Sequence, residues 1–487
     1  MKWSDYQQAI FEDVATGSGH AIVMARAGSG KTSTILEALS HVPAGKTAIV
    51  MAFNKKIADN IRPRAPAGVV VQTVSSYGHR INADVGLQFD ENYKKRKWGL
   101  FSDVLKEELS RDLRSDELAP YVKLYEMSRH YLASTPEAVS DVITTCSIDV
   151  PLWNRAAIVA TVVKVLESSK NPGGGYGFDE QWWFPIVNDY PSPKFDFVFI
   201  DETQDLSIAK VELALRACKP EGRIIAVGDD RQAIYGFAGA DFMAMGRMKD
   251  RLQSRVLPLS VCYRCPVSVV RLAKEIVPDL EWSPDAKNGS VIEIGEKEIA
   301  VLAKPGDVVI ARTNAAIAKQ FFRFLGSQQK VVIQGRDFST EFVGLIDRSK
   351  CTTIPTLVAW VTKWQEKEVA KCMAETPPRD ISKVQDVASC LLMFCEHAKS
   401  VTWLKDRIKS LCTSDEADNS DAITLSTCHK AKGLEWNKVF MLRDTFMKSR
   451  PNKDGEWADP SIEEANLLYV ATTRAKSALY LARSEKT

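Results

Sequence analysis

Short runs of apolar, mostly β-branched residues recur along the chain in two series, and they limit the folds open to it. Runs of this kind, without polar alternation, are typical of strands buried on both faces of a parallel sheet. Helical stretches separate the runs, so the sequence predicts an α/β fold with two doubly wound parallel sheets. The runs are residues 21–24, 47–53, 69–73, 195–200 and 223–227 in the first series, and 307–311, 330–334, 422–426, 438–442 and 478–482 in the second.

The spacing of the runs predicts two domains, each interrupted by a mainly helical insertion. A chain of 487 residues exceeds what one hydrophobic core usually organises. Each series of strands also contains one long interruption of different character. The expected boundaries are residues 1–81 and 191–258 for the first α/β domain, 82–190 for its insertion, 259–339 and 420–487 for the second α/β domain, and 340–419 for its insertion.

Composition excludes few functions. The 64 basic and 62 acidic residues give a net charge of +2, which neither requires nor excludes a polyanionic partner. The first residues lack the basic flank and apolar run of a signal peptide, and no later segment reaches membrane-spanning length, so we expect a cytoplasmic protein without a membrane partner. The ten cysteines are expected to be reduced. The closely spaced Cys262 and Cys265 lack the second pair that a zinc site needs, and no metal is assigned to them.

Two segments of the first insertion have unusual compositions. The basic run at residues 94–97 fits either a solvated helix face or a nucleic-acid contact. The glycine-rich residues 172–178 have no strand before them and no Lys-Thr after them. They therefore predict a flexible connection and not a phosphate-binding loop.

A second glycine-rich loop has the context that a phosphate-binding loop requires, because it follows a predicted strand and opens a helix. Backbone N–H groups in this loop, together with the helix N-terminus, can cradle phosphate oxygens. Lys31 would neutralise the β and γ phosphates of a nucleotide, and Thr32 would bind Mg²⁺. Ala25 replaces the first glycine of the general pattern. The residues expected around the phosphates are Ala27, Gly28, Ser29, Gly30, Lys31, Thr32 and Ser33.

Two carboxylates follow the predicted strand at residues 195–200. The carboxyl ends of strands are where open α/β sheets bind their ligands. We assign Asp201 to Mg²⁺ and Glu202 to orienting or deprotonating the attacking water. An acidic turn after a strand is the alternative, but the preceding loop favours a site that binds and hydrolyses ATP.

Several motifs occur in a fixed order over nearly the whole chain outside the two insertions. In this order they resemble the motifs of the UvrD/Rep-type superfamily 1 DNA helicases. The resemblance implies two RecA-like motor domains, and it implies that the insertion at residues 340–419 is reduced. The motifs are residues 4–7 (SDYQ), 52–56 (AFNKK), 72–80 (QTVSSYGHR), 201–205 (DETQD), 228–240 (GDDRQAIYGFAGA), 259–264 (LSVCYR), 427–435 (TCHKAKGLE) and 469–475 (YVATTRA).

The resemblance implies further residues of the ATP site. A guanidinium brought to the transferring phosphoryl group stabilises the charge of the transition state. Cys262 replaces an asparagine common in the family, which weakens a local hydrogen bond more than it affects catalysis. The implied roles are adenine recognition for Gln7, γ-phosphate contact for Gln204, Gln232 and Arg264, stacking on adenine for Tyr263, ribose contact for Glu435 and an arginine finger for Arg474.

The resemblance also implies a track for single-stranded DNA. Aromatic faces let bases stack whatever their sequence, at about 1–3 kcal/mol each, although a core position is the ordinary explanation for a single aromatic residue. Ala238 stands where the family usually has arginine, so one strand contact is absent or supplied elsewhere. The candidates are Tyr235 and Phe237 for stacking, Phe53, Lys56, Thr73 and His79 for strand contact, and His429 for coupling the strand to the nucleotide.

Together these features predict an ATP- and Mg²⁺-dependent DNA helicase or translocase that moves along single-stranded DNA, 3′ to 5′ by resemblance. Expected partners are single-stranded DNA, junctions with duplex and accessory proteins of replication or repair, and the chain is expected to be a monomer. It would be associated with the nucleoid in a cell, or lie in the host cytoplasm if viral. The alternatives are a translocase that displaces proteins or remodels recombination intermediates, and an ATP-switched DNA-binding scaffold.

Overall fold

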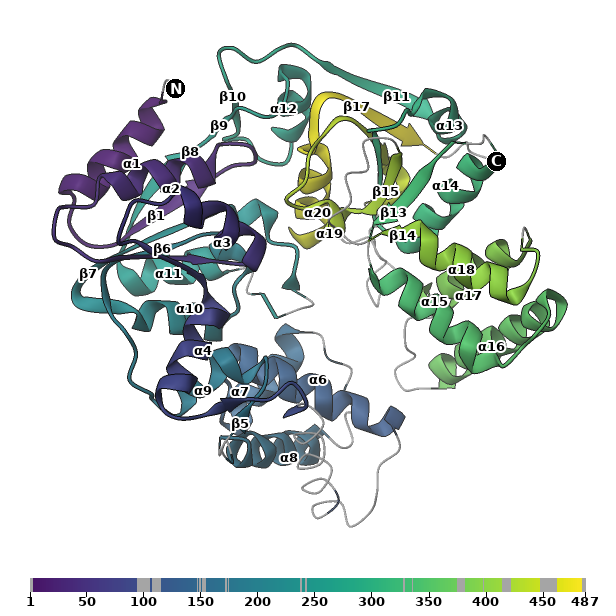
Figure 1. The fold of residues 1–487 in the computed structure, drawn as a ribbon, viewed down its shortest axis with the longest axis horizontal. Helices are drawn as coiled ribbons and strands as arrows, with labels where there is room; N and C mark the ends of the chain where they lie inside the picture. Colours follow the sequence, from purple (N-terminus) through teal and green to yellow (C-terminus); the bar gives the residue numbers. More distant parts are fainter. Residues whose placement is uncertain are drawn as a thin grey trace. The chain divides into compact units, whose positions relative to one another are not determined.

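The computed structural model divides the chain into two compact units, Met1–Ser260 and Val261–Thr487 (Figure 1). No helix in the part of the chain that is described has the length and apolarity needed to cross a membrane. The described residues are 3–93, 106, 115–146, 148, 150, 155–170, 173, 175–236, 239–240, 243–326, 329–334, 336–374, 382–396, 398–413, 422–446 and 462–483.

Unit 1 (residues 1–260) is built on a six-stranded sheet in which every neighbouring pair is parallel. This confirms the predicted α/β class. The strand β1 lies between β7 and β8, and Ile22 pairs with both Ala226 and Val256. The strand order is β3 (Val70–Thr73), β2 (Ala48–Ala52), β6 (Phe195–Ile200), β7 (Cys218–Gly228), β1 (Ala21–Ala25) and β8 (Arg255–Leu259).

Helices cover both faces of this sheet. Strand residues alternate between the faces, so that Val23 and Phe199 pack with α1 and α2, whereas Ile22 and Val198 pack with α4, α9 and α10. Side-chain oxygens cap several helices, and Ser4 forms a reciprocal capping box with Gln7 at the start of α1. The helices flanking the sheet are α1 (Asp5–Thr16), α2 (Lys31–Ser40), α3 (Lys55–Ile61), α4 (Val74–Asp84), α10 (Ile208–Arg216) and α11 (Ala244–Leu252), with short 3₁₀ turns η1 (Arg62–Arg64), η3 (Thr203–Asp205) and η4 (Asp230–Gln232).

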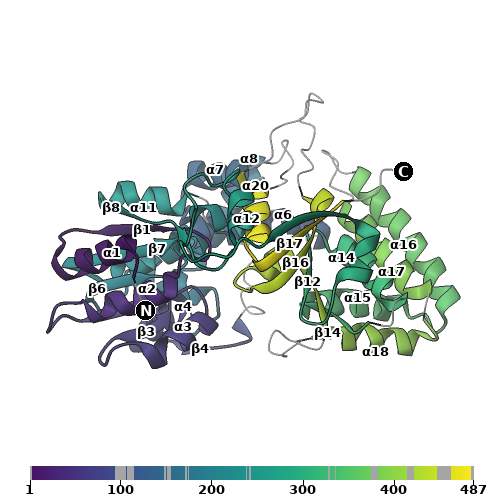
Figure 2. The same cartoon turned by 90° about the horizontal axis from the view of Figure 1, so that it is seen from above.

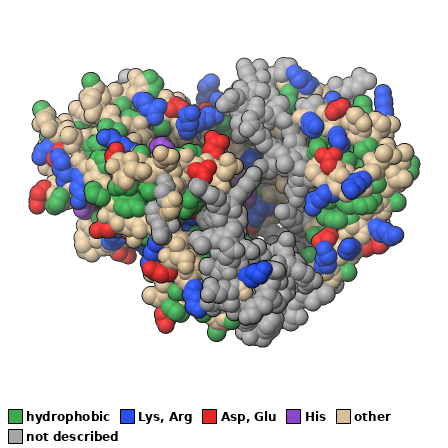
Figure 3. Space-filling view, turned by 60° about the horizontal axis from the view of Figure 1, so that its bottom comes forward, with side chains coloured by type: hydrophobic (Ala, Val, Ile, Leu, Met, Phe, Trp, Pro, Cys, Tyr) green, Lys and Arg blue, Asp and Glu red, His purple; other side chains and the backbone are tan. Residues whose placement is uncertain are grey.

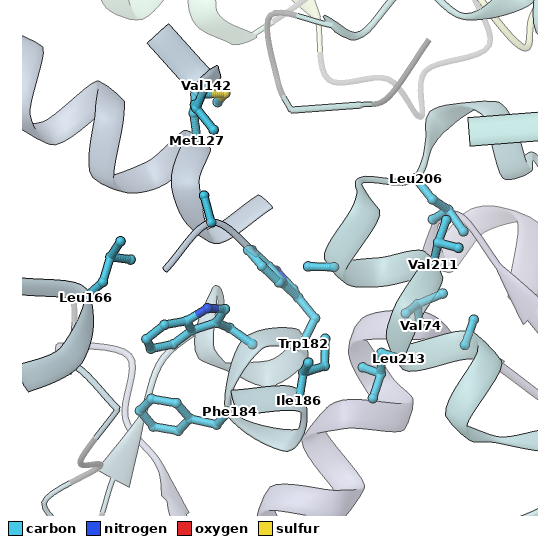
Figure 4. Packing of buried hydrophobic residues seen from close by; sticks show 14 of the residues in the cluster. Val74, Met127, Val142, Leu166, Trp182, Phe184, Ile186, Leu206, Val211 and Leu213 are labelled. Atoms are coloured by element: carbon cyan, nitrogen blue, oxygen red, sulfur yellow. The ribbon is translucent and has the colours of Figure 1, made fainter. Parts of the chain in front are cut away.

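The described part of the segment between α4 and β6 is mainly helical and shares its core with one face of the sheet. Figure 4 shows Trp182 and Ile186 of α9 beside Val74 of α4 and Leu213 of α10. The elements of this segment are β4 (Gln88–Phe89), α6 (Ser115–Tyr131), α7 (Pro136–Thr145), α8 (Arg155–Ser168), β5 (Gly175–Tyr176) and α9 (Glu180–Val187).

The glycine-rich residues 172–178 differ from expectation. Gly175 and Tyr176 form β5, which pairs with β4, and the Tyr176 side chain is fully buried. The prediction of a flexible connection is therefore wrong for these two residues, because the buried tyrosine ring fixes the backbone that carries it. The basic run at residues 94–97 lies outside the described residues.

Unit 2 (residues 261–487) contains a second parallel sheet, of seven strands. A small pair, β9 (Val261–Cys262) and β10 (Glu281–Trp282), precedes it. The strand order of the large sheet is β11 (Ser290–Gly295), β17 (Ala475–Arg483), β16 (Trp436–Leu442), β12 (Val308–Ala311), β15 (Ile423–Thr427), β13 (Val331–Gln334) and β14 (Cys412–Thr413).

Helices α15 to α18 form the segment between β13 and β14, and they lie together in both views of the fold (Figures 1 and 2). They share one apolar core with α14 and the sheet. On the face drawn in Figure 3, acidic and basic side chains are interspersed over the described surface. The helices of unit 2 are α12 (Val267–Ala273), α13 (Ile299–Leu302), α14 (Asn314–Gly326), α15 (Arg336–Ser349), α16 (Ile354–Ala374), α17 (Ser382–Glu396), α18 (Val401–Leu411), α19 (Cys428–Ala431) and α20 (Ile462–Thr472), with 3₁₀ turns η6 (Glu296–Glu298) and η7 (Arg443–Thr445).

Candidate nucleotide-binding site

The loop between β1 and α2 has the backbone of a phosphate cradle. Gly28 and Gly30 adopt the left-handed conformation, with φ of +71° and +81°, which glycine enters without steric cost. The Ser29 hydroxyl is buried and finds no hydrogen-bond partner among the described residues. Because buried hydroxyls are normally hydrogen-bonded, this orphaned group marks a place for a polar ligand such as a phosphate.

Lys31 and Glu202 face each other beside this loop. The Lys31 Nζ lies 2.8 Å from Glu202 Oε2. Burial alone would lower the pKa of Lys31, but the carboxylates of Glu202, Asp229 and Asp201 raise it above its ordinary value, so the lysine is a stable cation. Glu202 itself has φ of +50°, an uncommon conformation for a residue with a side chain.

Asp201 directly follows β6 and is almost fully buried. Burial, together with the Glu202 carboxylate beside it, raises the pKa of Asp201 above its ordinary value. A divalent cation at this carboxylate would relieve that penalty. The hydroxyl of Thr32 and the carboxylate of Asp201 are hard oxygen ligands of the kind Mg²⁺ takes, usually with phosphate oxygens and water completing its shell. The described residues include no group of three or more His, Cys, Asp and Glu placed to hold a metal ion.

Two glutamines join this centre to the loop after β7. Gln204 Nε2 donates to Glu202 Oε2 at 2.6 Å, and Gln204 Oε1 accepts from the Asp229 N–H at 3.0 Å. Gln232 Nε2 donates to Asp229 Oδ2 at 2.6 Å. The structure therefore brings Gln204, Gln232, Glu202 and Lys31 into one hydrogen-bonded network. Sequence reasoning missed Asp229, which links the two glutamines.

Gln7 is placed beside the loop but already has partners. Its Oε1 accepts from the Ser4 N–H at 3.1 Å, and its Nε2 donates to Thr34 Oγ1 at 3.0 Å. These contacts cap α1 and fasten it to α2. Recognition of adenine by Gln7 stays a prediction.

The candidates for strand contact in unit 1 fall into two groups. The rings of Phe53 and Tyr235 stack, with centroids 6.2 Å apart and planes 13° from parallel, and Lys56 is exposed on α3. Thr73 accepts from the Ser76 N–H at 3.0 Å as the cap of α4. His79 Nδ1 lies 2.8 Å from the Tyr176 hydroxyl, so these last two have local structural partners. Phe237 lies outside the described residues.

In unit 2, Arg264, the last residue of the LSVCYR motif, forms an ion pair with Glu435, the last residue of the TCHKAKGLE motif. Arg264 Nε lies 2.6 Å from Glu435 Oε2, and Lys476 Nζ lies 3.4 Å from Glu435 Oε1. Arg264 also donates to the Thr473 carbonyl at 3.3 Å. The neighbouring Tyr263 is exposed over about half of its surface, at 47%, which suits a ring that stacks on a ligand.

Arg474 lies next to this pair but points into unit 2. It is 1% exposed, and its guanidinium donates to the carbonyls of Val470 at 2.9 Å and Leu434 at 3.1 Å. Burial, reinforced by the nearby Arg264, lowers its pKa to about 10. An arginine finger must reach a phosphate, so Arg474 would have to exchange these carbonyls for its ligand. His429, on α19, is partly buried, and burial with the Arg312 charge lowers its pKa to about 4, so its ring is neutral at pH 7.

A left-handed glycine loop, a lysine and carboxylates at the neighbouring strand end define unit 1 as a P-loop nucleotide-binding fold. A family model described as an AAA domain matches residues 7–238, and one described as a UvrD-like helicase C-terminal domain matches residues 312–486. The chain belongs to the UvrD/Rep-type superfamily 1 helicases.

Curated relatives are similar over most of this chain. F-box DNA helicase protein 1 of Schizosaccharomyces pombe is 25% identical over 94% of the chain and 55% of its own length. F-box DNA helicase 1 of Gallus gallus is 22% identical over 99% of the chain and 49% of its own length. ATP-dependent DNA helicase PcrA of Staphylococcus aureus is 21% identical over 96% of the chain and 82% of its own length. The chain thus spans about half the length of the two F-box relatives.

Proposed function

We propose that this chain is an ATP-dependent DNA helicase that moves 3′ to 5′ along single-stranded DNA and separates strands ahead of it. The observation that carries the proposal is the Lys31–Glu202 pair, 2.8 Å apart beside a left-handed glycine loop with an orphaned serine hydroxyl. The polarity and the DNA track rest on the family resemblance. The relatives' names, which include ATP-dependent DNA helicases, support the same activity.

In this proposal Lys31 changes partner during the cycle. Without nucleotide it neutralises Glu202; when a γ-phosphate occupies the loop, the lysine turns to the phosphate and leaves Glu202 free to orient the attacking water. Thr32 and Asp201 would hold Mg²⁺, which would supply positive charge to the phosphates. Arg264 and Arg474 stay candidate contacts of the γ-phosphate, and Arg474 could take that role only after leaving its backbone carbonyls.

The strand track rests on the stacked rings of Phe53 and Tyr235 and on the exposed Lys56. Aromatic faces accept any base, and lysine contacts phosphate without reading sequence. Binding should therefore show little sequence preference and should weaken as salt concentration rises.

DNA-stimulated ATPase and unwinding of 3′-tailed and 5′-tailed duplexes test the proposal together. We expect Lys31→Ala to lower the DNA-stimulated kcat by at least about 100-fold, because it removes the charge on the terminal phosphates. Lys170→Ala is the control, since it removes a lysine–glutamate pair on the surface of the same unit and should leave kcat unchanged. Near-normal turnover by Lys31→Ala, or unwinding only of 5′-tailed duplexes, would contradict the proposal.

A translocase that displaces proteins from DNA is the second candidate. The resemblance favours it, because it implies that the insertion at residues 340–419 is reduced; the described elements between β13 and β14 are α15 to α18. Streptavidin displacement from biotinylated single strands, without unwinding of either tailed duplex, would select this alternative.

A further inference from the structure

Arg26 lies inside the glycine loop, yet its side chain turns away from the phosphate cradle toward the loop after β7. Its Nη1 lies 3.1 Å from Asp229 Oδ1 and 2.6 Å from Asp230 Oδ1. The Arg26 side chain is 9% exposed and that of Asp229 is fully buried. A charged pair this deep is maintained only when each charge compensates the other.

Asp229 is the point where the network of the site converges. One of its carboxylate oxygens is held by Arg26, and the other accepts from Gln232. Its backbone N–H donates to Gln204, which in turn donates to Glu202, the partner of Lys31. The path from Arg26 to Lys31 is continuous: side-chain hydrogen bonds make each step, except that Asp229 reaches Gln204 through its backbone N–H.

The charge on Asp229 depends on its cationic neighbours. Burial raises the pKa of Asp229, whereas the charges of Arg26 and Lys31 oppose that rise. Lys31 is also the residue that must turn to the γ-phosphate during the proposed cycle. Arg26 is then the cation that continues to hold Asp229 when Lys31 changes partner.

We propose that Arg26 is a positioning residue that couples the state of the nucleotide to the strand track. It anchors Asp229, so that a change at Lys31 and Glu202 is transmitted through Gln204 to the η4 turn and its Gln232, and onward to Tyr235 three residues later. The inference deepens the proposed ATPase and rests on it. It assigns to the loop a function beyond phosphate binding, carried by a side chain that pairs with Asp229 and Asp230.

The competing explanation is that Arg26 only stabilises the fold. The chain offers a matched pair for this comparison in the middle of β7. Arg223 Nη2 lies 2.7 Å from Asp13 Oδ2, and both side chains are 9% exposed. Arg223 also donates to the Gly19 carbonyl at 2.7 Å. Its contacts tie α1 to the sheet and include none of the network residues.

The experiment compares Arg26→Gln and Arg26→Lys with Arg223→Gln in the full chain. We expect Arg26→Gln to lower the DNA-stimulated kcat about tenfold while the KM for ATP changes less than about threefold, since the phosphate cradle is intact. Arg26→Lys should recover part of kcat by restoring the charge. The Arg223→Gln variant should lose thermal stability but keep the wild-type kcat. Wild-type kcat in Arg26→Gln, or an equal loss of kcat in Arg223→Gln, would overturn the inference.

Hydrogen exchange supplies a readout that does not need turnover. We expect the amides of residues 228–236 to exchange faster in Arg26→Gln than in wild type, and to be unchanged in Arg223→Gln. Unchanged exchange in Arg26→Gln overturns the anchoring of this loop. If the wild-type protein hydrolyses no ATP, the proposed function fails, while the exchange result still decides whether Arg26 positions the loop.

Discussion

Gly30 of the phosphate loop shows how backbone conformation can require a glycine where space alone would not. A Cβ built on Gly30 approaches only Gln7 Nε2, at 3.8 Å, so space would permit a larger residue. The φ of +81° does not, because L-residues with a side chain adopt it at a cost of roughly 1–2 kcal/mol. The glycine is required by backbone geometry and not by crowding.

Gly30→Ala should therefore lower the free energy of unfolding by about 1 kcal/mol. Gly246 is the matched control: it lies within α11, and a Cβ there would meet nothing within 4 Å. Gly246→Ala should raise the free energy of unfolding by about 0.5–1 kcal/mol, as expected for alanine in a helix. Urea denaturation of both variants measures whether each substitution raises or lowers the free energy of unfolding. A stabilised Gly30→Ala would refute the backbone argument.

At the scale of elements, α6 is fixed to α9 by buried polar and aromatic contacts. Arg129 lies 2.7 Å from Glu180, and the His130 ring stacks on Trp182 with centroids 4.6 Å apart. Burial, with the nearby Lys210 and Arg129 charges, lowers the pKa of His130 to about 3. The His130 ring is therefore neutral in the folded protein over the whole physiological range.

This packing predicts a pH dependence of stability. Between the ordinary histidine pKa of about 6.5 and about 3, the unfolded chain binds a proton at residue 130 that the folded chain does not. Stability should fall as pH decreases through this window, with His130 contributing a slope of up to about 1.4 kcal/mol per pH unit. His130→Phe keeps the stacking ring and should remove that contribution. Urea denaturation at several pH values would contradict the prediction if both proteins showed the same slope.

Strands show what can be inferred from sequence. All ten apolar runs coincide with strands of the two sheets, because full burial leaves a continuous apolar signature. The strands β8, β11 and β14 were missed. β8 contains Pro258 and is mostly exposed, β11 is partly exposed, and β14 has two residues, so none carries that signature.

The site shows a different limit of inference. Lys31 and Glu202 belong to local motifs, and the sequence predicted both. The pairing of Arg26 with Asp229 joins residues 203 positions apart, and neither residue type is distinctive where it stands. The sequence also could not predict that Arg474 points into unit 2, because a motif identifies the residue and not the backbone carbonyls around its side chain.

At the scale of the whole molecule, each unit has its own apolar cores. A fragment of residues 1–260 should therefore unfold cooperatively and bind MgATP. At a ligand concentration of about 100 Kd, binding adds about 2.7 kcal/mol to stability, which a thermal scan detects. Its DNA-stimulated hydrolysis should be lost, since Arg264 and Arg474 are missing. A fragment of residues 1–216 is the control, because it lacks both neighbours of β1.

The central place of β1 determines when the phosphate loop can form during synthesis. Its two partners, β7 and β8, are completed only at Gly228 and Leu259. At about 5–20 residues per second, the nascent loop leaves the ribosome roughly 10–50 seconds before its strand acquires both neighbours. Until β7 is complete β1 has no partner strand, and until β8 is complete one of its edges stays unpaired, so we expect the emerging chain to be a substrate for chaperones that bind such segments.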